Sequence, residues 1–441
     1  MIVPFCGSIE HDVSRRAFLG TLLTGTAALI GQSSAVHVLA EPALTGALKA
    51  QNKRVILLWL AGGPSQLETW DPKPGTRTGG PFAAIPTSIP GVHISELMPQ
   101  MAERLKHICL IRSLNTRNAD HGAAAELMMR GRADEASLRY PDMGAILARE
   151  LARTDSKVPD YVSFYTATEG RDFSKLTPSF LGARYAPMKI AENMMPPNLK
   201  RAGSITEEDH FARAQLQELL NMRFMEGRDI APVKSHAQAY ARVHGLMSSE
   251  DLFDISKEPK HVRDKYGPTL FGQQALMARR MVEAGVSFVR VSRAWWDSHG
   301  QNFETHQEMV PELDRVMAAL LDDLKQRGLL ENTLVVTMGE FGRTPDINAS
   351  LGRDHFASAW SAALFGCGIH PGAVFGKTDQ LGKAVVEGEV SEGRLFATIL
   401  RAVGIDHQKE YHVGPRPIPL VNPGIKPIAE LLLSSDGHRA A

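Results

Sequence analysis

The amino-acid sequence predicts an α/β protein with a mainly parallel central sheet. Apolar runs of strand length alternate along the chain with amphipathic stretches of helical length. In one unit, an expected strand at 286–292 leads into a long amphipathic helix at 305–327 and then into a strand at 333–338. Two strands joined by a helix in this way form a crossover of the parallel type. Functional side chains are therefore expected at the carboxyl ends of the strands.

Further elements follow in chain order. The run at 53–61 is apolar from Val55 onward and ends at Gly62 and Gly63, which is typical of a strand buried on both faces. Other strands are expected at 107–112, 161–164 and 361–365, and helices at 95–106, 123–129, 140–154, 271–284 and 393–403.

The segment from about 166 to 260 has a different texture. It holds Met- and Pro-containing loops and polar helices near 207–227 and 234–246, without alternating strands. We interpret this segment as a helical insertion or lid on the main domain and not as an independent domain.

The charge balance argues against nucleic-acid binding. The chain of 441 residues has 49 basic and 49 acidic residues, so no net positive field attracts a phosphate backbone. After the first 40 residues no apolar stretch is long enough to span a membrane, so no transmembrane span is expected in the mature chain. Cys109 and Cys367 lie in apolar runs and are expected to be buried thiols, although export would also permit a disulfide.

The N-terminus carries an export pattern. Residues 14–19 read SRRAFL, a mildly apolar run follows at 20–31, and small residues near 38–40 offer a cleavage site. Twin arginines before such a run indicate a Tat signal peptide over residues 1–40. The alternative is an internal apolar helix or an uncleaved anchor, but the run is shorter than the ~20 residues that a membrane span needs. We therefore expect the Tat translocase to export a mature domain of residues 41–441 to the periplasm.

Polar side chains follow several of the expected strands. Glu340 comes directly after the strand at 333–338, Asp354 and His355 come a dozen residues later, and Asp297 and His299 follow the strand at 286–292. The ends of parallel strands meet at one edge of a sheet, so these side chains are expected to lie close together. Carboxylates and imidazoles are the usual ligands of divalent cations. These five residues are our predicted metal site.

Each of these residues alone also has a purely structural explanation. Asp297 and His299 could be a loop cap and a solvated histidine, and His355 could hydrogen-bond only to the backbone. Arg343 could form a salt bridge to Glu340, or its guanidinium could bind an ester oxyanion through two parallel hydrogen bonds, that is, in bidentate geometry.

Three more residues are candidates by position. His121 stands at the start of an expected helix, where unpaired N–H groups attract anions. Ser65 follows the first strand and is a candidate nucleophile by location only. His306 could be a further ligand or could face solvent.

Five motifs together resemble the bacterial family called domain of unknown function 1501. These motifs, accompanied by the export signal, are GGPSQLETWDPKP, RSLNTRNADHGAAAELMMRG, WDSHGQNF, TMGEFGRTP and GRDHF. More distantly, that family resembles the alkaline phosphatase and sulfatase superfamily. The resemblance implies a three-layer α/β/α sandwich of alkaline phosphatase type. It also implies that the protein hydrolyses phosphate or sulfate esters at a divalent-metal site.

The resemblance also implies roles for individual residues. Glu340 matches an acidic ligand, Phe341 stands where that motif has a ligand histidine, and His355 resembles a later histidine ligand. Asp297 and His299 resemble ligands before the long helix. His121 stands where the superfamily carries its nucleophile.

The expected function is an exported hydrolase of sulfate or phosphate esters, with sulfated glycans among its substrates. One divalent cation (Ca, Zn, Mg or Mn) is expected, with Arg343 binding the oxyanion and His121 acting as nucleophile or general acid/base. The alternative is a catalytically inactive sulfatase-like binding or accessory protein.

Overall fold

The computed structural model describes residues 48–153, 156, 158–164, 175–192, 194–196, 204–226 and 250–433. The expected signal peptide and the expected helix at 234–246 lie outside these ranges. The described residues belong to one compact unit, Ala47–Ala441. Within them no helix is long and apolar enough to cross a membrane. Cys109 and Cys367 are both buried free thiols, as the sequence predicted.

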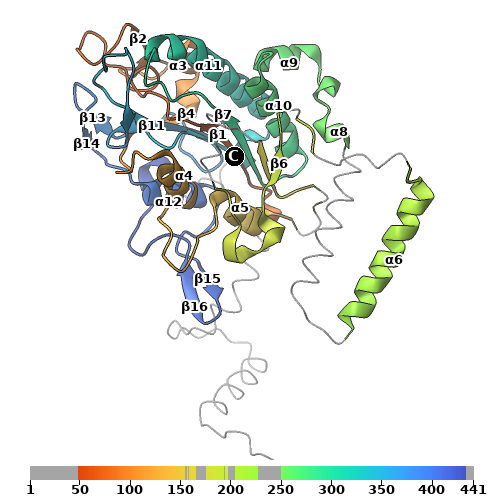
Figure 1. The fold of residues 1–441 in the computed structure, drawn as a ribbon. Helices are drawn as coiled ribbons and strands as arrows, with labels where there is room; N and C mark the ends of the chain where they lie inside the picture. Colours follow the sequence, from red (N-terminus) through yellow and green to blue (C-terminus); the bar gives the residue numbers. More distant parts are fainter. Residues whose placement is uncertain are drawn as a thin grey trace, which may run out of the picture. The chain divides into compact units, whose positions relative to one another are not determined.

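An eight-stranded sheet forms the centre of the described residues (Figure 1). Its strand order is β12-β4-β11-β8-β1-β7-β5-β6. The strands, in that order, are Val374–Phe375, Ile108–Leu114, Trp360–Gly366, Thr333–Met338, Arg54–Leu60, Phe288–Arg293, Tyr161–Phe164 and Met188–Ile190. All neighbouring strands pair in parallel except β11, which is antiparallel to both β4 and β8. The sheet is therefore mainly parallel, as predicted.

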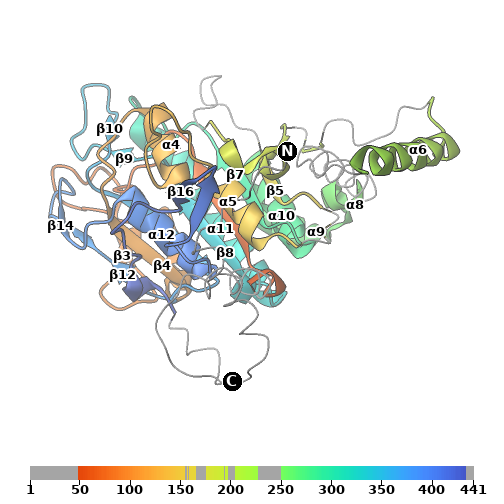
Figure 2. The same cartoon turned by 90° about the horizontal axis from the view of Figure 1, so that it is seen from below.

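Both faces of the sheet are covered. In β1, Ile56, Leu58 and Leu60 point into one apolar core, and Val55 and Leu57 point into the other, since successive strand residues alternate in direction. Helices α3, α9, α10 and α11 lie on the first side, and α4, α5 and α12 lie on the second (Figures 1 and 2). In the same order these helices are Pro99–Arg104, Lys260–Tyr266, Leu270–Glu283, Asn302–Gln326, His121–Arg130, Met143–Leu151 and Glu392–Ala402. The predicted α/β/α sandwich is confirmed.

The remaining elements are short or peripheral. The segment at 166–260 contributes β6, which is the edge strand of the sheet. It also contains the helices α6 (Glu207–Met225) and α8 (Glu250–Phe253). Four two-stranded ribbons lie outside the main sheet: β2 with β3, β9 with β10, β13 with β14, and β15 with β16. Their strands are Ala84–Pro86, His93–Ser95, Gly342–Arg343, His355–Phe356, Lys377–Thr378, Val385–Glu387, Glu410–Val413 and Arg416–Pro419. The helix expected at 95–106 covers only Pro99–Arg104, because β3 includes Ser95 at its start and a 3-10 turn, Leu105–His107, replaces its end.

A buried ion pair joins two loops at the carboxyl edge of the sheet. Arg353 and Glu68 are both 0 % exposed, and the Arg353 Nη2 lies 2.7 Å from Oε1 of Glu68. The guanidinium also donates to the carbonyls of Thr78 and Thr344, at 2.8 and 3.1 Å. One side chain therefore ties the loop after β1 to the loop after β8.

Replacing Glu68 by alanine is expected to destabilise the protein strongly. The Glu68→Ala variant leaves a buried guanidinium without its carboxylate, which costs about 3–5 kcal/mol. Urea unfolding of the purified variant measures this change. The matched control is Arg77→Ala, which breaks the ion pair of Arg77 with Asp346, whose side chains are 62 % and 54 % exposed. This variant should change stability by less than about 1 kcal/mol. Equal effects of the two substitutions would contradict the structural role of the buried pair.

Candidate metal centre

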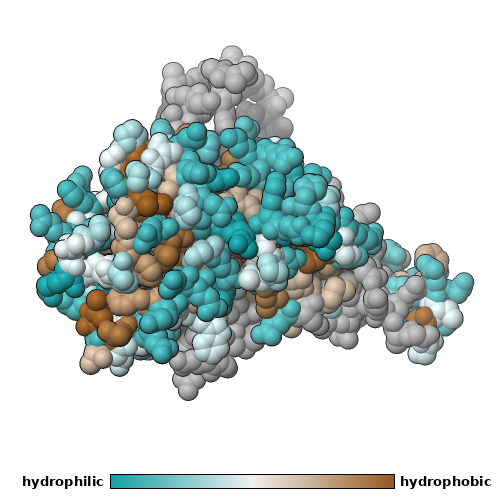
Figure 3. Space-filling view, turned by 90° about the horizontal axis from the view of Figure 1, so that it is seen from above, coloured by the Kyte–Doolittle hydropathy of each residue, from teal (hydrophilic) through white to brown (hydrophobic). Residues whose placement is uncertain are grey.

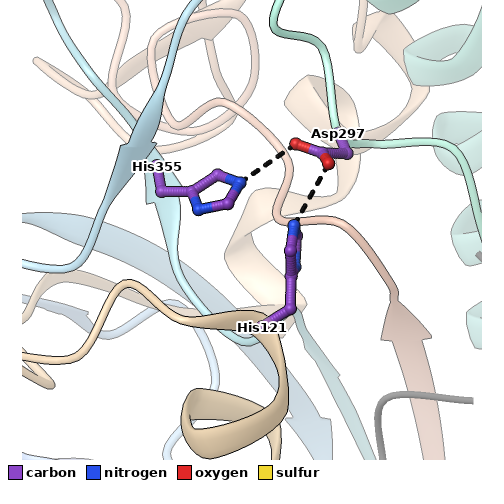
Figure 4. Close-up of side chains that lie close together, drawn as sticks. All are labelled: His121, Asp297 and His355. Atoms are coloured by element: carbon purple, nitrogen blue, oxygen red, sulfur yellow. Dashed lines mark hydrogen bonds and ion pairs between the residues drawn. The ribbon is translucent and has the colours of Figure 1, made fainter.

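Three side chains from distant parts of the chain meet beyond the carboxyl ends of the parallel strands. Figure 4 shows His121 from the start of α4, Asp297 from the loop after β7, and His355 from β10, all pointing toward one another. The side chain of Asp120 accepts from the N–H of Ala123, and this N-cap makes α4 begin at His121. The loop after β8 reaches the same edge because β11 runs back through the sheet in the opposite direction.

The carboxylate of Asp297 is the centre of this cluster. Its Oδ2 lies 3.1 Å from Nε2 of His121. Its Oδ1 lies 3.2 Å from Nε2 of His355, 3.1 Å from Nε2 of His299 and 2.6 Å from Nη2 of Arg343. The carboxylate of Asp297 therefore contacts three imidazoles, each through its Nε2 atom.

The other nitrogen of each imidazole is already engaged by an oxygen that can only accept. Nδ1 of His355 lies 2.8 Å from the carbonyl of Ala119, and Nδ1 of His299 lies 2.7 Å from Oδ1 of Asp354. Nδ1 of His121 lies 2.7 Å from Oε1 of Glu340. With a cation in the centre, each neutral imidazole would carry its one N–H on Nδ1, facing these acceptors. The Nε2 lone pairs would then face the cation, which is the arrangement that metal-bound histidines show.

Without a cation this arrangement would be unfavourable. Nε2 of His299 and Nε2 of His355 are 3.0 Å apart, so two lone pairs would meet beside an anionic oxygen. Burial by itself lowers the pKa of His121, but its bonds to Asp297 and Glu340 raise the pKa to about 9. A protonated His121 partly neutralises the two carboxylates, and a cation between the nitrogens would neutralise them more completely.

Glu340 holds a second buried carboxylate beside the cluster. Its side chain is 1 % exposed, and its Oε1 accepts from the N–H of Gly62 at 2.8 Å. Its Oε2 is buried and has no hydrogen-bond partner among the described residues. Since an unpaired buried oxygen of this kind is costly, Glu340 Oε2 is a further candidate ligand atom.

Two of the predicted ligands lie at the solvent side. The side chains of His299 and Asp354 are 49 % and 55 % exposed. Asp354 also accepts from Nδ2 of Asn348 at 3.2 Å, so its contacts orient His299 and do not point toward Asp297. Of the predicted ligand set, Asp297 and His355 are the less exposed members that face each other, and the structure adds His121, whose nitrogen lies within 4.8 Å of their ligand atoms.

Arg343 is a structural guanidinium. It is 0 % exposed and donates to the carbonyls of Gly63 and Arg353, at 2.9 and 3.2 Å, and to the carbonyl of Gly62. Its ion-pair partner is Asp297 and not Glu340, which corrects one of the two sequence interpretations. Burial and these bonds leave it without the open face that oxyanion binding requires. Burial would raise the pKa of Asp297, but the hydrogen bonds from the imidazoles and the Arg343 guanidinium hold that pKa well below its usual range.

Ser65 and His306 belong to a neighbouring buried network. Ser65 is 0 % exposed, its N–H donates to Nε2 of His306 at 2.9 Å, and its hydroxyl accepts from the N–H of Leu67 at 3.3 Å. Nδ1 of His306 lies 2.8 Å from the carbonyl of Asn302. The structure therefore gives no support to Ser65 as a nucleophile. His306 is fully buried, neither a ligand nor facing solvent, and burial lowers its pKa to about 4.

Phe341 forms an apolar wall of the centre. It is 0 % exposed, and its ring centroid lies 4.6 Å from that of His355 and 4.9 Å from that of His121. The residue that the resemblance marks as a missing ligand thus packs against two ligand candidates and limits their rotation.

The family comparison agrees with this description. The family model described as "Protein of unknown function (DUF1501)" matches residues 52–432. This chain belongs to the DUF1501 family. The resemblance inferred from the motifs of this DUF1501 protein is confirmed. A search of the curated proteins found no match.

Solved structures were also compared with this DUF1501 protein. The PsFucS1 sulfatase from Pseudoalteromonas sp. is 12 % identical, with 85 % of this chain and 72 % of that chain covered and a TM-score of 0.40. The lipoteichoic acid synthase LtaP from Listeria monocytogenes is 10 % identical, with 87 % and 77 % covered and a TM-score of 0.39. The alkaline phosphatase from the Antarctic bacterium TAB5 is 14 % identical, with 80 % and 98 % covered and a TM-score of 0.36. The architecture of the DUF1501 protein rests on its own strand order and cores, not on these likenesses.

A Gly62→Ala substitution is expected to disturb the centre. Gly62 has a φ of +111°, and a Cβ there would lie 2.5 Å from the backbone nitrogen of Asp297. Stability should fall by more than the roughly 1–2 kcal/mol that a left-handed alanine costs. The matched control is Gly91→Ala, where φ is +78° and nothing lies within 4 Å of the new Cβ. Thermal unfolding compares the two variants, and an equal loss would show that Gly62 is needed only for its φ.

Proposed function

We propose that this DUF1501 protein binds a divalent cation and hydrolyses phosphate or sulfate esters with it. The observation that carries the proposal is the convergence of three Nε2 atoms on Asp297, each with its Nδ1 engaged elsewhere. His121, Asp297 and His355 would hold the cation, with His299 and Oε2 of Glu340 adjoining. The resemblance to the alkaline phosphatase and sulfatase superfamily suggests the ester chemistry.

The donor set fits such a cation. Imidazole nitrogens combined with carboxylate oxygens suit Zn²⁺ or Mn²⁺, whereas Ca²⁺ and Mg²⁺ prefer oxygen ligands alone. The unpartnered Oε2 of Glu340 is an independent indication, since a buried oxygen without a donor is stabilised by a bound cation.

Arg343 and His299 would have different roles in the proposed hydrolysis. A bound cation would polarise the ester or a water molecule. Arg343 keeps Asp297 ionised and in place, because the two groups are 2.6 Å apart in a buried environment. His299 is half-exposed and backed by Asp354, so its Nε2 is placed to exchange a proton with the leaving group or with water.

One observation favours a second candidate, a metal-dependent binding or accessory protein without turnover. Among the described residues, the side chains that contact the Asp297 carboxylate are imidazoles and a guanidinium, and none offers a hydroxyl or thiol nucleophile. Hydrolysis would then have to proceed by attack of water.

Export by the Tat pathway and sulfated glycans as substrates remain part of the proposal, supported by the twin-arginine pattern and by the family resemblance.

Metal analysis of the purified mature chain tests the cation site. We expect about one Zn²⁺ or Mn²⁺ per chain, which also raises the thermal midpoint, because a ligand of the folded state stabilises it. His355→Ala should lose the metal and this shift. His412→Ala, which removes an exposed histidine of β15, should keep both. The site would be refuted if the wild-type chain contained none of Ca²⁺, Zn²⁺, Mg²⁺ and Mn²⁺ and if none of them raised its thermal midpoint.

Turnover separates the two candidate functions. The metal-loaded protein should hydrolyse 4-nitrophenyl phosphate or 4-nitrophenyl sulfate, and the His355→Ala variant should be at least ~100-fold slower, since the ligand set is incomplete. The His412→Ala variant should match the wild type. Metal binding without turnover of either ester would favour the binding protein over the hydrolase.

A further inference from the structure

A cavity of about 290 Å³ opens beside the end of β7. Its walls combine apolar and polar groups. Trp295 and Leu270 line it with side chains that are 59 % and 43 % exposed, and Arg293, Glu312 and Gln274 line it with charged and amide groups. Its volume is at the lower end of the roughly 300–1,000 Å³ that small-molecule sites occupy. It is therefore suited to a single ring and not to a long polymer segment.

The backbone at Trp295 is in an unusual conformation. Trp295 has a φ of +75°, a left-handed value that bulky residues rarely adopt. The next residue, Trp296, is 0 % exposed, so the turn buries one indole and holds the other in solvent. Strain of this kind at a large residue is found mainly at binding and catalytic sites. Glycine would fit this position without strain, so the indole itself is the feature that needs an explanation.

The exposed indole of Trp295 offers a contact surface for a ligand. Figure 3 shows one face of the protein, which is mainly hydrophilic with separate hydrophobic patches. An exposed tryptophan offers a large rigid face whose negative π-cloud attracts C–H groups of a ligand. Trp295 and Leu270 together make the apolar side of the cavity.

The polar side of the cavity suits hydroxyl groups. Nε of Arg293 lies 2.7 Å from Oε2 of Glu312, so this pair presents both donors and acceptors. Gln274 adds an amide that is only 1 % exposed. Glu192 is the other charged residue of the lining, and the cavity thus has one cation and two carboxylates. This balance disfavours an anion in the cavity, and the paired donors and acceptors suit a ligand with several hydroxyls.

We propose that this cavity is a sugar subsite, in which Trp295 stacks against a neutral pyranose ring. Trp295 and Asp297 are two residues apart, so their Cα atoms are separated by at most about 7 Å. The loop after β7 thus contributes Trp295 to the cavity and Asp297 to the candidate metal centre, and a neighbouring ring or substituent of the bound sugar would carry the sulfate or phosphate ester. The choice of substrate rests on the proposed hydrolase function, whereas binding of the sugar does not.

Sugar binding can be tested without catalysis. The probe is an array of neutral pyranose oligosaccharides and their sulfated counterparts, and the strongest hit is then titrated by calorimetry. Wild type should bind at least one pyranose oligosaccharide, and Trp295→Ala should bind it about 10-fold or more weakly, because truncation of a central aromatic anchor removes most of its contact. His355→Ala should keep the affinity for a neutral oligosaccharide, since it alters only the metal centre.

Leu351→Ala is the matched control. Leu351 is also 59 % exposed and has a positive φ of 55°, but it does not line the cavity. Its variant should bind the sugar as wild type does. Trp295→Gly should keep a thermal midpoint equal to or above that of wild type, because it removes backbone strain.

The outcomes separate this proposal from the hydrolase proposal. Ester turnover with no binding anywhere on the array, or equal affinity of wild type and Trp295→Ala, would overturn the subsite alone. A clear fall of the thermal midpoint in Trp295→Gly would also overturn it, since the indole would then serve folding. Sugar binding that depends on Trp295, in a protein without bound metal or turnover, would refute the hydrolase and leave the subsite standing.

Discussion

Arg343 and Asp297 form a buried ion pair where the loops after three strands meet. The guanidinium has no access to solvent, and it also binds carbonyls of the loop after β1, so it holds that loop, the loop after β8 and Asp297 together. A buried guanidinium is strongly unfavourable without its carboxylate, and Asp297 is therefore kept both ionised and fixed. The imidazoles of His121, His299 and His355 all converge on this carboxylate. The arrangement of these side chains in the candidate metal centre depends on this pair.

The topology of the sheet explains how residues far apart in sequence reach one edge. β8 is parallel to β1 and β7, so the loops after these strands share an edge. β11 is antiparallel to β8, and the chain between them therefore stays at that edge instead of crossing to the other end. This connection brings His355 next to Asp297. A conventional parallel crossover after β8 would have carried the chain away from the centre.

The departures from the resembled superfamily have physical explanations in the structure. Gly62 provides a backbone N–H for Glu340 and a carbonyl for Arg343, so the loop after the first strand contributes main-chain atoms beside the centre. Phe341 replaces a ligand by an apolar wall that packs on two histidines. The centre is consequently built around a single cluster of nitrogens. This agrees with our proposal of one cation and of attack by water.

Much of the fold could be predicted from local sequence. Apolar runs such as 53–61 and 333–338 identify strands that are buried on both faces, and the repeating apolar face of 305–327 identifies α11, because both patterns depend only on neighbouring residues. The positions of the candidate ligands at strand ends were also predictable, as was the DUF1501 resemblance. What each side chain contacts was not predictable.

Arg343 illustrates this limit, because the sequence offers Glu340 and an ester oxyanion as equal partners, and only packing decides for Asp297. The same holds for His306, which a nearby backbone N–H turns into a buried acceptor, and for Trp295, whose left-handed backbone has no signal in the sequence. The sequence by itself thus determined the strands, the helices and which edge of the sheet carries the polar groups. The tertiary structure alone decided which of those groups meet, because hydrogen-bond partners and burial arise between segments that are distant in the chain.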